Sequence, residues 1–586
     1  MAKSFPFGFC GPSYTAQSPI VDDELAMNCY CENSESDAAA TKRALLHVPG
    51  KKKFAALPES KVPCLFTVNG RTFAAGSNLY EIDGSGAVTN RGSLGAAPTT
   101  PTQITANETQ LVVLNNGNLY VLTLATNAFV AVNMAQFNGP VAQIEFLDGY
   151  IIATLQNSHT FQVSNLEDAT TWGGLDIATI SYFPDNITSM KVEHRYIWFF
   201  SAKKAVAYYN AGAGFPPFIP VQGEFLEQGS GAAFATVQLD NTLFWLDQDE
   251  RGFMVARRLG QGRVSTHATE LAWQQYTTTS DAVGWTYQEY GHLFWVLYFP
   301  TANATWCYDV ATGLWHQRGY FVTESGQYIA DRAMSHTLNF GIHLVGDWAS
   351  GNIYQLSSTL STDDGNPIRG VRRTPTVSEN NEWIYFESIE FIMETGLLTI
   401  FDPQPPTLIP ILDANNVLRN LCVQEGGILS APLSAADPAA AQTLFLNDTL
   451  NKTSWQIKIS GAGVIGATQL GAFSAANSNS LTFVSVNADQ VWVLSLTDLG
   501  GGLAQLSLSP IGFVGRGPQL MLRWSNDGGK TWSNIYFLDA GKQGEYEKRV
   551  IKRMLGRARK RVWEASWTDP IPWRFNDAVL KARLAS

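Results

Sequence analysis

The residues best suited to bind a charged partner lie in one short stretch near the C-terminus. Arg557, Arg559 and Arg561 alternate, and a dense basic run over 548–553 precedes them. Alternate residues of a β-strand share a face, so the pattern predicts one arginine face that continues into Trp563. Guanidinium groups pair in plane with carboxylates and phosphates, whereas ordinary surface ion pairs contribute little. The candidates for a subunit interface or a DNA conduit, as opposed to a solvated face, are Arg549, Arg553, Arg557, Arg559 and Arg561.

A second pattern, Ser525-x-Asp527-x-Gly529-x-Thr531-Trp532, has the spacing of the Asp-box of sialidase-type propellers. The carboxylate of such a box accepts backbone N–H bonds within its turn, and glycine adopts the left-handed conformation. We expect the tryptophan to pack beneath the turn. With strand-like residues over 520–524 and 531–538, the pattern predicts a structural β-hairpin formed around Ser525, Asp527, Gly529 and Trp532.

Catalytic chemistry finds little support in the sequence. A glycosidase needs two carboxylates that face each other across a pocket, and the spacing of Asp247, Asp249 and Glu250 singles out no pair. The motifs G-x-S-x-G and H-E-x-x-H and the P-loop are absent. The acidic triplet over 22–24 reads as a solvated or salt-bridged turn. We therefore predict no catalytic residues and no enzyme activity.

Metal binding has an equally weak signal. The C-x-C pair at Cys29 and Cys31 lacks a second pair or a nearby histidine. We expect no metal and no cofactor, and free thiols in a reducing cytoplasm. The cysteines are Cys10, Cys29, Cys31, Cys64, Cys307 and Cys422.

Composition predicts an all-β chain of two to four domains. The 586 residues include 50 Gly, 17 Trp, 20 Tyr and 32 Phe, but only 16% are charged. The net charge of −11 argues against a general nucleic-acid coat, which needs a basic surface. The first six residues lack the apolar core of a signal peptide, and no apolar run could span a bilayer. We expect folding in the cytoplasm and no membrane insertion.

A repeat predicts a β-propeller. An apolar strand, a Gly/Asn/Ser turn and then Leu-Tyr or Ile-Tyr on a second strand occur over 68–82, 111–122 and 343–356. Weaker copies occupy 149–163, 195–209, 241–255 and 291–310. Units that begin about 40 to 50 residues apart are typical of four-stranded blades. The repeat predicts six or seven blades over 62–362, with ordinary hairpins packed in sandwiches as the alternative.

The flanking segments predict further domains. Residues 1–61 read as an extended arm laid over another domain or subunit. Residues 363–397 and 515–586 read as the two parts of a C-terminal β platform, separated by an inserted, β-sandwich-like domain over 398–514 that is poor in Lys and Arg. An insertion of this kind requires that the ends of the guest domain lie close together.

Several of these segments resemble the tail hub or nozzle proteins of short-tailed bacteriophages, the packaged-DNA stabilisation family. The similar segments are 523–532 with 541–567, "GPSYTAQSP", "VPGKKKFAALP" and the first repeat "LFTVNGRTFAAGSNLYEI". The resemblance covers both ends and the propeller but not the insertion. It implies a virion tail protein, assembled in the host cytoplasm as a hexameric ring on a tail adaptor protein. Such rings close the DNA conduit until ejection, contact genomic double-stranded DNA transiently and help to mount tail fibres or spikes.

The residues fit this implication in two ways. The axis of a propeller is filled by side chains and is too narrow for a duplex, so a conduit would form between subunits around a ring axis. A largely acidic surface would let DNA slide, because no counterion release would hold it. The insertion would face outward, toward fibres or the host envelope.

Two other functions stay open at this point. One is a carbohydrate-active propeller, either a sialidase-like hydrolase or a lectin, and the other is a propeller scaffold with another partner. Oligomeric state together with glycan hydrolysis separates the first of these from the nozzle.

Overall fold

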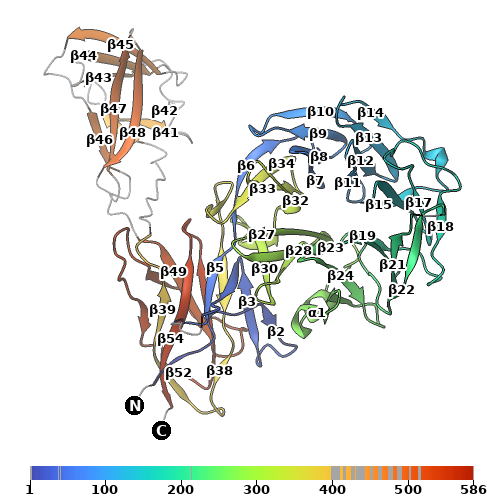
Figure 1. Cartoon of the computed structure of the whole chain (residues 1–586). Helices are drawn as coiled ribbons and strands as arrows, with labels where there is room; N and C mark the ends of the chain where they lie inside the picture. Colours follow the sequence, from blue (N-terminus) through green and yellow to red (C-terminus); the bar gives the residue numbers. More distant parts are fainter. Residues whose placement is uncertain are drawn as a thin grey trace. The chain divides into compact units, whose positions relative to one another are not determined.

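The computed structural model describes residues 3–36, 39, 41–212, 214–397 and 517–584, and the backbones of nine strands between 409 and 511. The chain divides into two compact units (Figure 1). The first comprises Met1–Thr395, Gln519–Ala540 and Tyr546–Ser586, and the second Gly396–Pro518 and Gly541–Glu545. In the described residues, strands dominate and the only helices are α1 (His267–Gln274) and the 3-10 turn η1 (Met134–Gln136).

Seven blades form a propeller in the first unit, which confirms the upper of the two predicted blade numbers. The first three blades consist of β7 (Cys64–Val68), β8 (Arg71–Ala75), β9 (Asn78–Ile82) and β10 (Val88–Ser93); β11 (Gln103–Ala106), β12 (Gln110–Asn115), β13 (Asn118–Thr123) and β14 (Phe129–Ala131); and β15 (Val141–Leu147), β16 (Tyr150–Leu155), β17 (Thr160–Val163) and β18 (Ile177–Thr179).

The next three blades follow the same antiparallel order. They consist of β19 (Ser189–Glu193), β20 (Tyr196–Phe200), β21 (Ala205–Asn210) and β22 (Phe218–Leu226); β23 (Val237–Leu239), β24 (Thr242–Gln248), β25 (Met254–Arg258) and β26 (Gly262–Arg263); and β27 (Val283–Glu289), β28 (His292–Phe299), β29 (Ala304–Asp309) and β30 (Leu314–Val322), with β31 (Gln327–Ala330) paired to β30. The Leu-Tyr and Ile-Tyr dipeptides recur because each lies on the third strand of a blade: Tyr80 on β9, Tyr120 on β13 and Tyr354 on β34.

An N-terminal strand closes the ring. The seventh blade contains β32 (Ala333–Asn339), β33 (Ile342–Asp347), β34 (Asn352–Ser357) and, as its outer strand, β6 (Gly50–Ala56). On β6, the Lys51 ammonium group is buried between the carboxylates of Asp331 and Asp363, at 2.6 and 3.1 Å. The predicted start of the propeller at residue 62 therefore misses one strand, which lies in the predicted arm. Local periodicity could not reveal it, because β6 pairs with residues about 300 positions away.

The rest of the predicted arm is also built into sheets. The strands are β1 (Lys3–Pro6), β2 (Tyr14–Thr15), β3 (Asp23–Met27), β4 (Cys29–Asn33) and β5 (Arg43–His47). β3 pairs in parallel with β30 at Met27 and Gln317 and antiparallel with β37 (Gly370–Arg373). One continuous sheet therefore joins the sixth blade to the C-terminal platform.

The platform is a β-sandwich of two sheets. One sheet has the order β4-β5-β54-β39-β51, with β1 beside β54 and β52 beside β39; the other continues from β3 as β37-β53-β49-β50. Its remaining strands are β39 (Ile384–Met393), β49 (Gln519–Ser525), β50 (Tyr536–Asp539), β51 (Val550–Arg553), β52 (Arg557–Ala558), β53 (Lys560–Trp567) and β54 (Arg574–Leu584). Of the remaining short strands, β38 (Val377–Ser378) pairs with β53, whereas β35 (Thr362–Asp363) and β36 (Asn366–Pro367) extend the sheet of the seventh blade beyond β6.

Aromatic side chains fill the platform core between the two sheets. Trp563 lies edge-on to Phe386 at 5.6 Å between ring centroids, and Trp567 lies 4.9 Å from Phe575. Phe9, from the N-terminal segment, packs against Phe575 at 5.4 Å. The platform is therefore assembled from three segments that are far apart in the sequence.

The second unit occupies the stretch in which the sequence predicts an insertion over 398–514. Three three-stranded sheets are described there: β40 (Ile409–Leu412), β41 (Leu418–Val423) and β42 (Leu429–Ser430); β43 (Gln442–Asp448), β44 (Thr453–Ile459) and β45 (Ile465–Ala472); and β46 (Ser480–Val484), β47 (Val491–Gly500) and β48 (Leu503–Ile511). The predicted sandwich-like packing depends on side chains outside the described residues. Among the described residues, no helix combines the length and the apolar composition that crossing a membrane requires.

Candidate functional site

The Asp-box-like turn has the hydrogen bonds that its sequence predicts. The Asp527 carboxylate accepts bonds from the backbone N–H groups of Lys530 and Thr531, at 3.0 and 2.9 Å, and from the hydroxyl of Ser525 at 2.6 Å. These donors, the Ser525 hydroxyl first, lower the pKa of Asp527. Gly529 has a φ of +88°, as expected for the left-handed position.

One detail of this hairpin differs from the prediction. The second strand begins at Tyr536 rather than at residue 531, because Asp527 binds the N–H groups that a ladder would use. Trp532 packs against the turn as expected, because its ring lies within van der Waals reach of Gly529. Its ring lies against the guanidinium groups of Arg373 and Arg523, at 5.1 and 4.5 Å, and both of these arginines pair with the buried Glu564.

The prediction that three arginines share one strand face is wrong for Arg561. A bend at Arg559 separates β52 from β53, and Arg561 turns into the core, where it is only 2% exposed. Its guanidinium donates to the carbonyl of Leu555 at 2.6 Å and to the Asn526 amide oxygen at 2.8 Å. Burial lowers the pKa of Arg561 to about 10. Arg561 stabilises the fold and cannot contact a partner in this conformation.

Arg557 and Arg559 are exposed and flank one indole ring. Their guanidinium carbons lie 4.9 and 5.3 Å from the centroid of Trp383, which is itself 41% exposed. Met554, 94% exposed, is bound through its backbone N–H to the carbonyl of Glu387 on the neighbouring β39. We call this surface the platform patch; it consists of Trp383, Tyr385, Met554, Arg557 and Arg559. Trp383 escaped the sequence analysis, although an aromatic residue directly before an alternating strand was a usable signal.

The other two arginine candidates lie on the same sheet. Arg549 forms a bidentate pair with Glu390 at 2.6 and 2.5 Å, so part of its binding capacity is used within the chain. Arg553 is exposed at the end of β51. The structure thus separates the five candidates into one buried, one paired and three exposed cations.

The propeller axis contains a cavity that is too small for a duplex. The first strand of every blade lines it, from Cys64 in the first blade to His336 in the seventh, and its volume is about 460 Å³. A sphere of that volume is about 10 Å across, less than the roughly 12 Å width of the major groove alone. Among the described residues that line the cavity, Glu145 is the single carboxylate, and it pairs with Lys191 at 2.5 Å.

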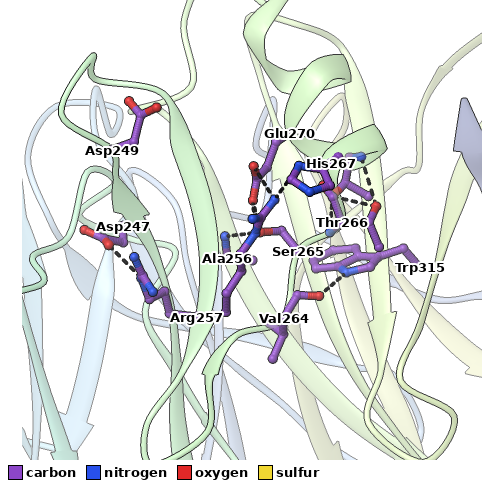
Figure 2. Close-up of polar contacts among 12 residues, drawn as sticks. Asp247, Asp249, Ala256, Arg257, Val264, Ser265, Thr266, His267, Glu270 and Trp315 are labelled. Atoms are coloured by element: carbon purple, nitrogen blue, oxygen red, sulfur yellow. Dashed lines mark hydrogen bonds and ion pairs between the residues drawn. The ribbon is translucent and has the colours of Figure 1, made fainter. Parts of the chain in front are cut away.

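Two of the three acids considered for glycoside hydrolysis have structural partners instead. The Asp247 carboxylate accepts a hydrogen bond from Arg257 at 2.7 Å (Figure 2) and another from the backbone N–H of Gly229. Asp249 accepts backbone N–H groups within its own turn, and Glu250 is exposed. No two of these three face each other across the axial cavity, since none of them lines it.

Two acids of the triplet are salt-bridged, one of the two predicted forms, whereas Asp22 forms no ion pair among the described residues. Asp23 pairs with Arg373 at 2.6 Å, and Glu24 pairs with Arg372. Arg372 is fully buried and also donates to the carbonyls of Phe9 and Pro12, at 2.5 and 2.7 Å. Its strand β37 lies in the predicted first part of the platform, but nothing in the local sequence singles out Arg372.

The five cysteines whose side chains are described are free thiols. Burial raises the pKa of Cys10 to about 12 and that of Cys31 to about 11, so both are protonated at neutral pH. Cys422 lies on β41, for which the structure describes only the backbone. Among the described residues, no group of three His, Cys, Asp or Glu side chains is arranged to hold a metal ion.

Comparison with known families accounts for both the propeller and the platform. Residues 36–361 match the family described as "Bacteriophage P22 Gp10, beta-propeller", and residues 492–582 match "Bacteriophage P22 Gp10, beta-sandwich". The chain belongs to the Gp10 family. Membership supports a structural role in a phage tail and in stabilising packaged DNA, and a location in the virion.

Other comparisons add no functional argument for this Gp10-family chain. No curated protein matches it. Among solved structures, it is similar to the computationally designed Ika8 protein, with 11% identity and a TM-score of 0.32, covering 52% of this chain and 99% of that one. It is also similar to the extracellular domain of a protein described as a one component system from B. thetaiotaomicron, with 9% identity and a TM-score of 0.35, covering 86% of this chain and 78% of that one.

Proposed function

We propose that this protein is the nozzle of a short phage tail, a ring that retains packaged DNA and conducts it on ejection. The observation that carries the proposal is the family match at both the propeller and the sandwich. The size of the axial cavity adds a constraint: DNA passes between copies arranged around a ring axis and not through one propeller. The protein acts by assembly, and catalysis plays no part.

Several partners follow from this proposal. The ring is a homo-oligomer, hexameric by resemblance to the family, and it docks on a tail adaptor protein and carries fibres or spikes. Contact with genomic double-stranded DNA is transient, because a net charge of −11 opposes lasting association with phosphates. Assembly takes place in the host cytoplasm, and the second unit faces outward.

Electron microscopy and light scattering of the purified full chain test the proposal. We expect closed rings in solution, and virions without the protein that lose their DNA. A chain that stays a single copy both in solution and in the particle would overturn the nozzle.

Glycan hydrolysis tests the rival function. We expect no turnover of sialosides or oligosaccharides by the purified chain, because the only described carboxylate of the axial cavity is held by Lys191. Turnover that is lost in Glu145→Gln would favour the hydrolase.

A further inference from the structure

Charge is distributed very unevenly along this chain. Residues 92–190 contain no lysine or arginine but seven acids: Glu108, Glu145, Asp148, Glu167, Asp168, Asp176 and Asp185. Residues 516–586 contain fifteen basic and seven acidic residues, a net charge of +8. Two regions of opposite net charge within one chain attract each other electrostatically, or attract a common partner.

The fold places the two regions far apart within one copy. Residues 92–190 build the second and third blades, whereas the platform joins the ring at the sixth blade, through β3 and β30. In a ring of seven blades, the position opposite the sixth lies between the second and the third. Figure 1 accordingly shows β17 and β18 on the side of the propeller away from β39 and β52. The basic C-terminal segment of one copy cannot reach its own acidic blades.

The third blade presents an ordered loop with exposed apolar side chains. We call residues 164–176, between β17 and β18, the blade-three loop. Leu166 and Leu175 are 60% and 89% exposed, and Glu167 is also exposed. The buried Trp172 anchors the loop, and its indole N–H donates to the carbonyl of Ala169 at 2.8 Å. One anchored loop presents these two exposed leucines and the exposed carboxylate of Glu167, so little backbone ordering is needed on binding.

The platform patch has the complementary chemistry. In the described part of the chain, no carboxylate forms an ion pair with Arg557 or Arg559, and both stack on Trp383. Met554 adds a flexible apolar side chain. Tryptophan, methionine and arginine are enriched at the centres of protein interfaces, where a few such residues dominate the binding energy.

We propose that the platform patch of one copy binds the blade-three loop of a second copy. Arg557 and Arg559 pair with the exposed Glu167, and Trp383 and Met554 pack on Leu166 and Leu175. Because the two surfaces differ and lie on opposite sides of one unit, the contact is heterologous and repeats from copy to copy until the ring closes. This assignment rests on the proposed ring and names the two surfaces that would build it.

Charge reversal tests the pairing. Variant X is Arg557→Glu/Arg559→Glu, and variant Y is Glu167→Lys/Leu175→Lys. Each alone puts like charges on both surfaces, so we expect the dissociation constant to rise more than about tenfold and monomers to dominate. An equal mixture of X and Y should assemble again, since the patch of X attracts the loop of Y and the patch of Y attracts the loop of X. Mass photometry reads out the assembly.

A matched control is Glu250→Lys, which reverses an exposed acid on the fifth blade, outside the acidic region. It should assemble like the wild type. Rings formed by variant Y alone, as by the wild type, would overturn the pairing, and so would a mixture of X and Y that stays monomeric. Neither result would overturn the proposed nozzle function. A wild-type chain that forms no rings would instead overturn the nozzle itself.

Discussion

The platform uses arginine in two opposite ways, in its core and at its edge. Arg372 and Arg561 are buried and satisfied by carbonyl oxygens, whereas Arg557 and Arg559 are exposed and stack on Trp383. Three of these four belong to one basic run, yet Arg561 stabilises the fold and its neighbours are available to a partner. The difference shows that burial and the number of nearby acceptors determine the role of a cation, since a buried charge is stable only with its hydrogen bonds satisfied.

The strongest way to test this contrast is Arg372→Met. The variant leaves Glu24 without its partner and removes the guanidinium bonds to four carbonyls, so we expect a loss of about 3–5 kcal/mol in the free energy of unfolding. Urea unfolding followed by tryptophan fluorescence measures the loss. Arg574→Met is the control, because its pair with Glu394 is long and half exposed, and it should change stability by less than about 0.5 kcal/mol.

A smaller loss is expected from Arg561→Met. Methionine keeps the packing against Phe386 and relieves the desolvation of the charge, but it gives up the bonds to Leu555 and Asn526. We expect a cost of about 1–3 kcal/mol. If instead the variant unfolds like the wild type but fails to assemble, Arg561 belongs to the interface after all.

Asp527→Asn tests the turn in which the Asn526 amide oxygen accepts a hydrogen bond from Arg561. The folded state lowers the pKa of Asp527 below its ordinary value of 3.8, so its carboxylate stabilises the hairpin above that pH and loses this effect as the solution is acidified through the folded-state pKa. The variant should be less stable than the wild type at pH 6, with a gap that narrows toward pH 2. A gap that is independent of pH would show that the charge is irrelevant.

Arg557→Ala/Arg559→Ala should have the smallest effect on unfolding, within about 0.5 kcal/mol, because both side chains are exposed. Assembly should nevertheless be lost, as light scattering of the folded monomer would show. Adding Arg561→Ala to this pair confounds the test, since a buried donor would be removed as well. Normal assembly of the double variant would show that the exposed arginines form a solvated face and not an interface.

Local patterns predicted the elements of this protein well. The strand–turn–Leu-Tyr repeat indicated a propeller, and Ser525, Asp527 and Gly529 indicated a turn whose hydrogen bonds the structure contains. Both depend on contacts within a few residues, namely alternation along strands and bonds inside one turn. Resemblance at the two ends of the chain indicated the family that the comparisons show.

The sequence predicted neither the pairing of strands that are far apart in the chain nor the burial of individual side chains. Nothing near Lys51 reveals that β6 closes the seventh blade beside residues 352–357, and nothing near Arg372 reveals the carbonyls of the N-terminal segment around it. The alternation of arginines over 557–561 predicts a shared face only if the strand is continuous. The bend at Arg559 interrupts the strand, and Arg561 is buried in the core.

The sequence by itself therefore determined the strands, the turns and the number of blades to within one, because these follow from short-range geometry. The tertiary structure alone decided which strand closes the ring, which arginines are buried and which remain exposed, because those outcomes depend on segments hundreds of residues apart packing around the same core.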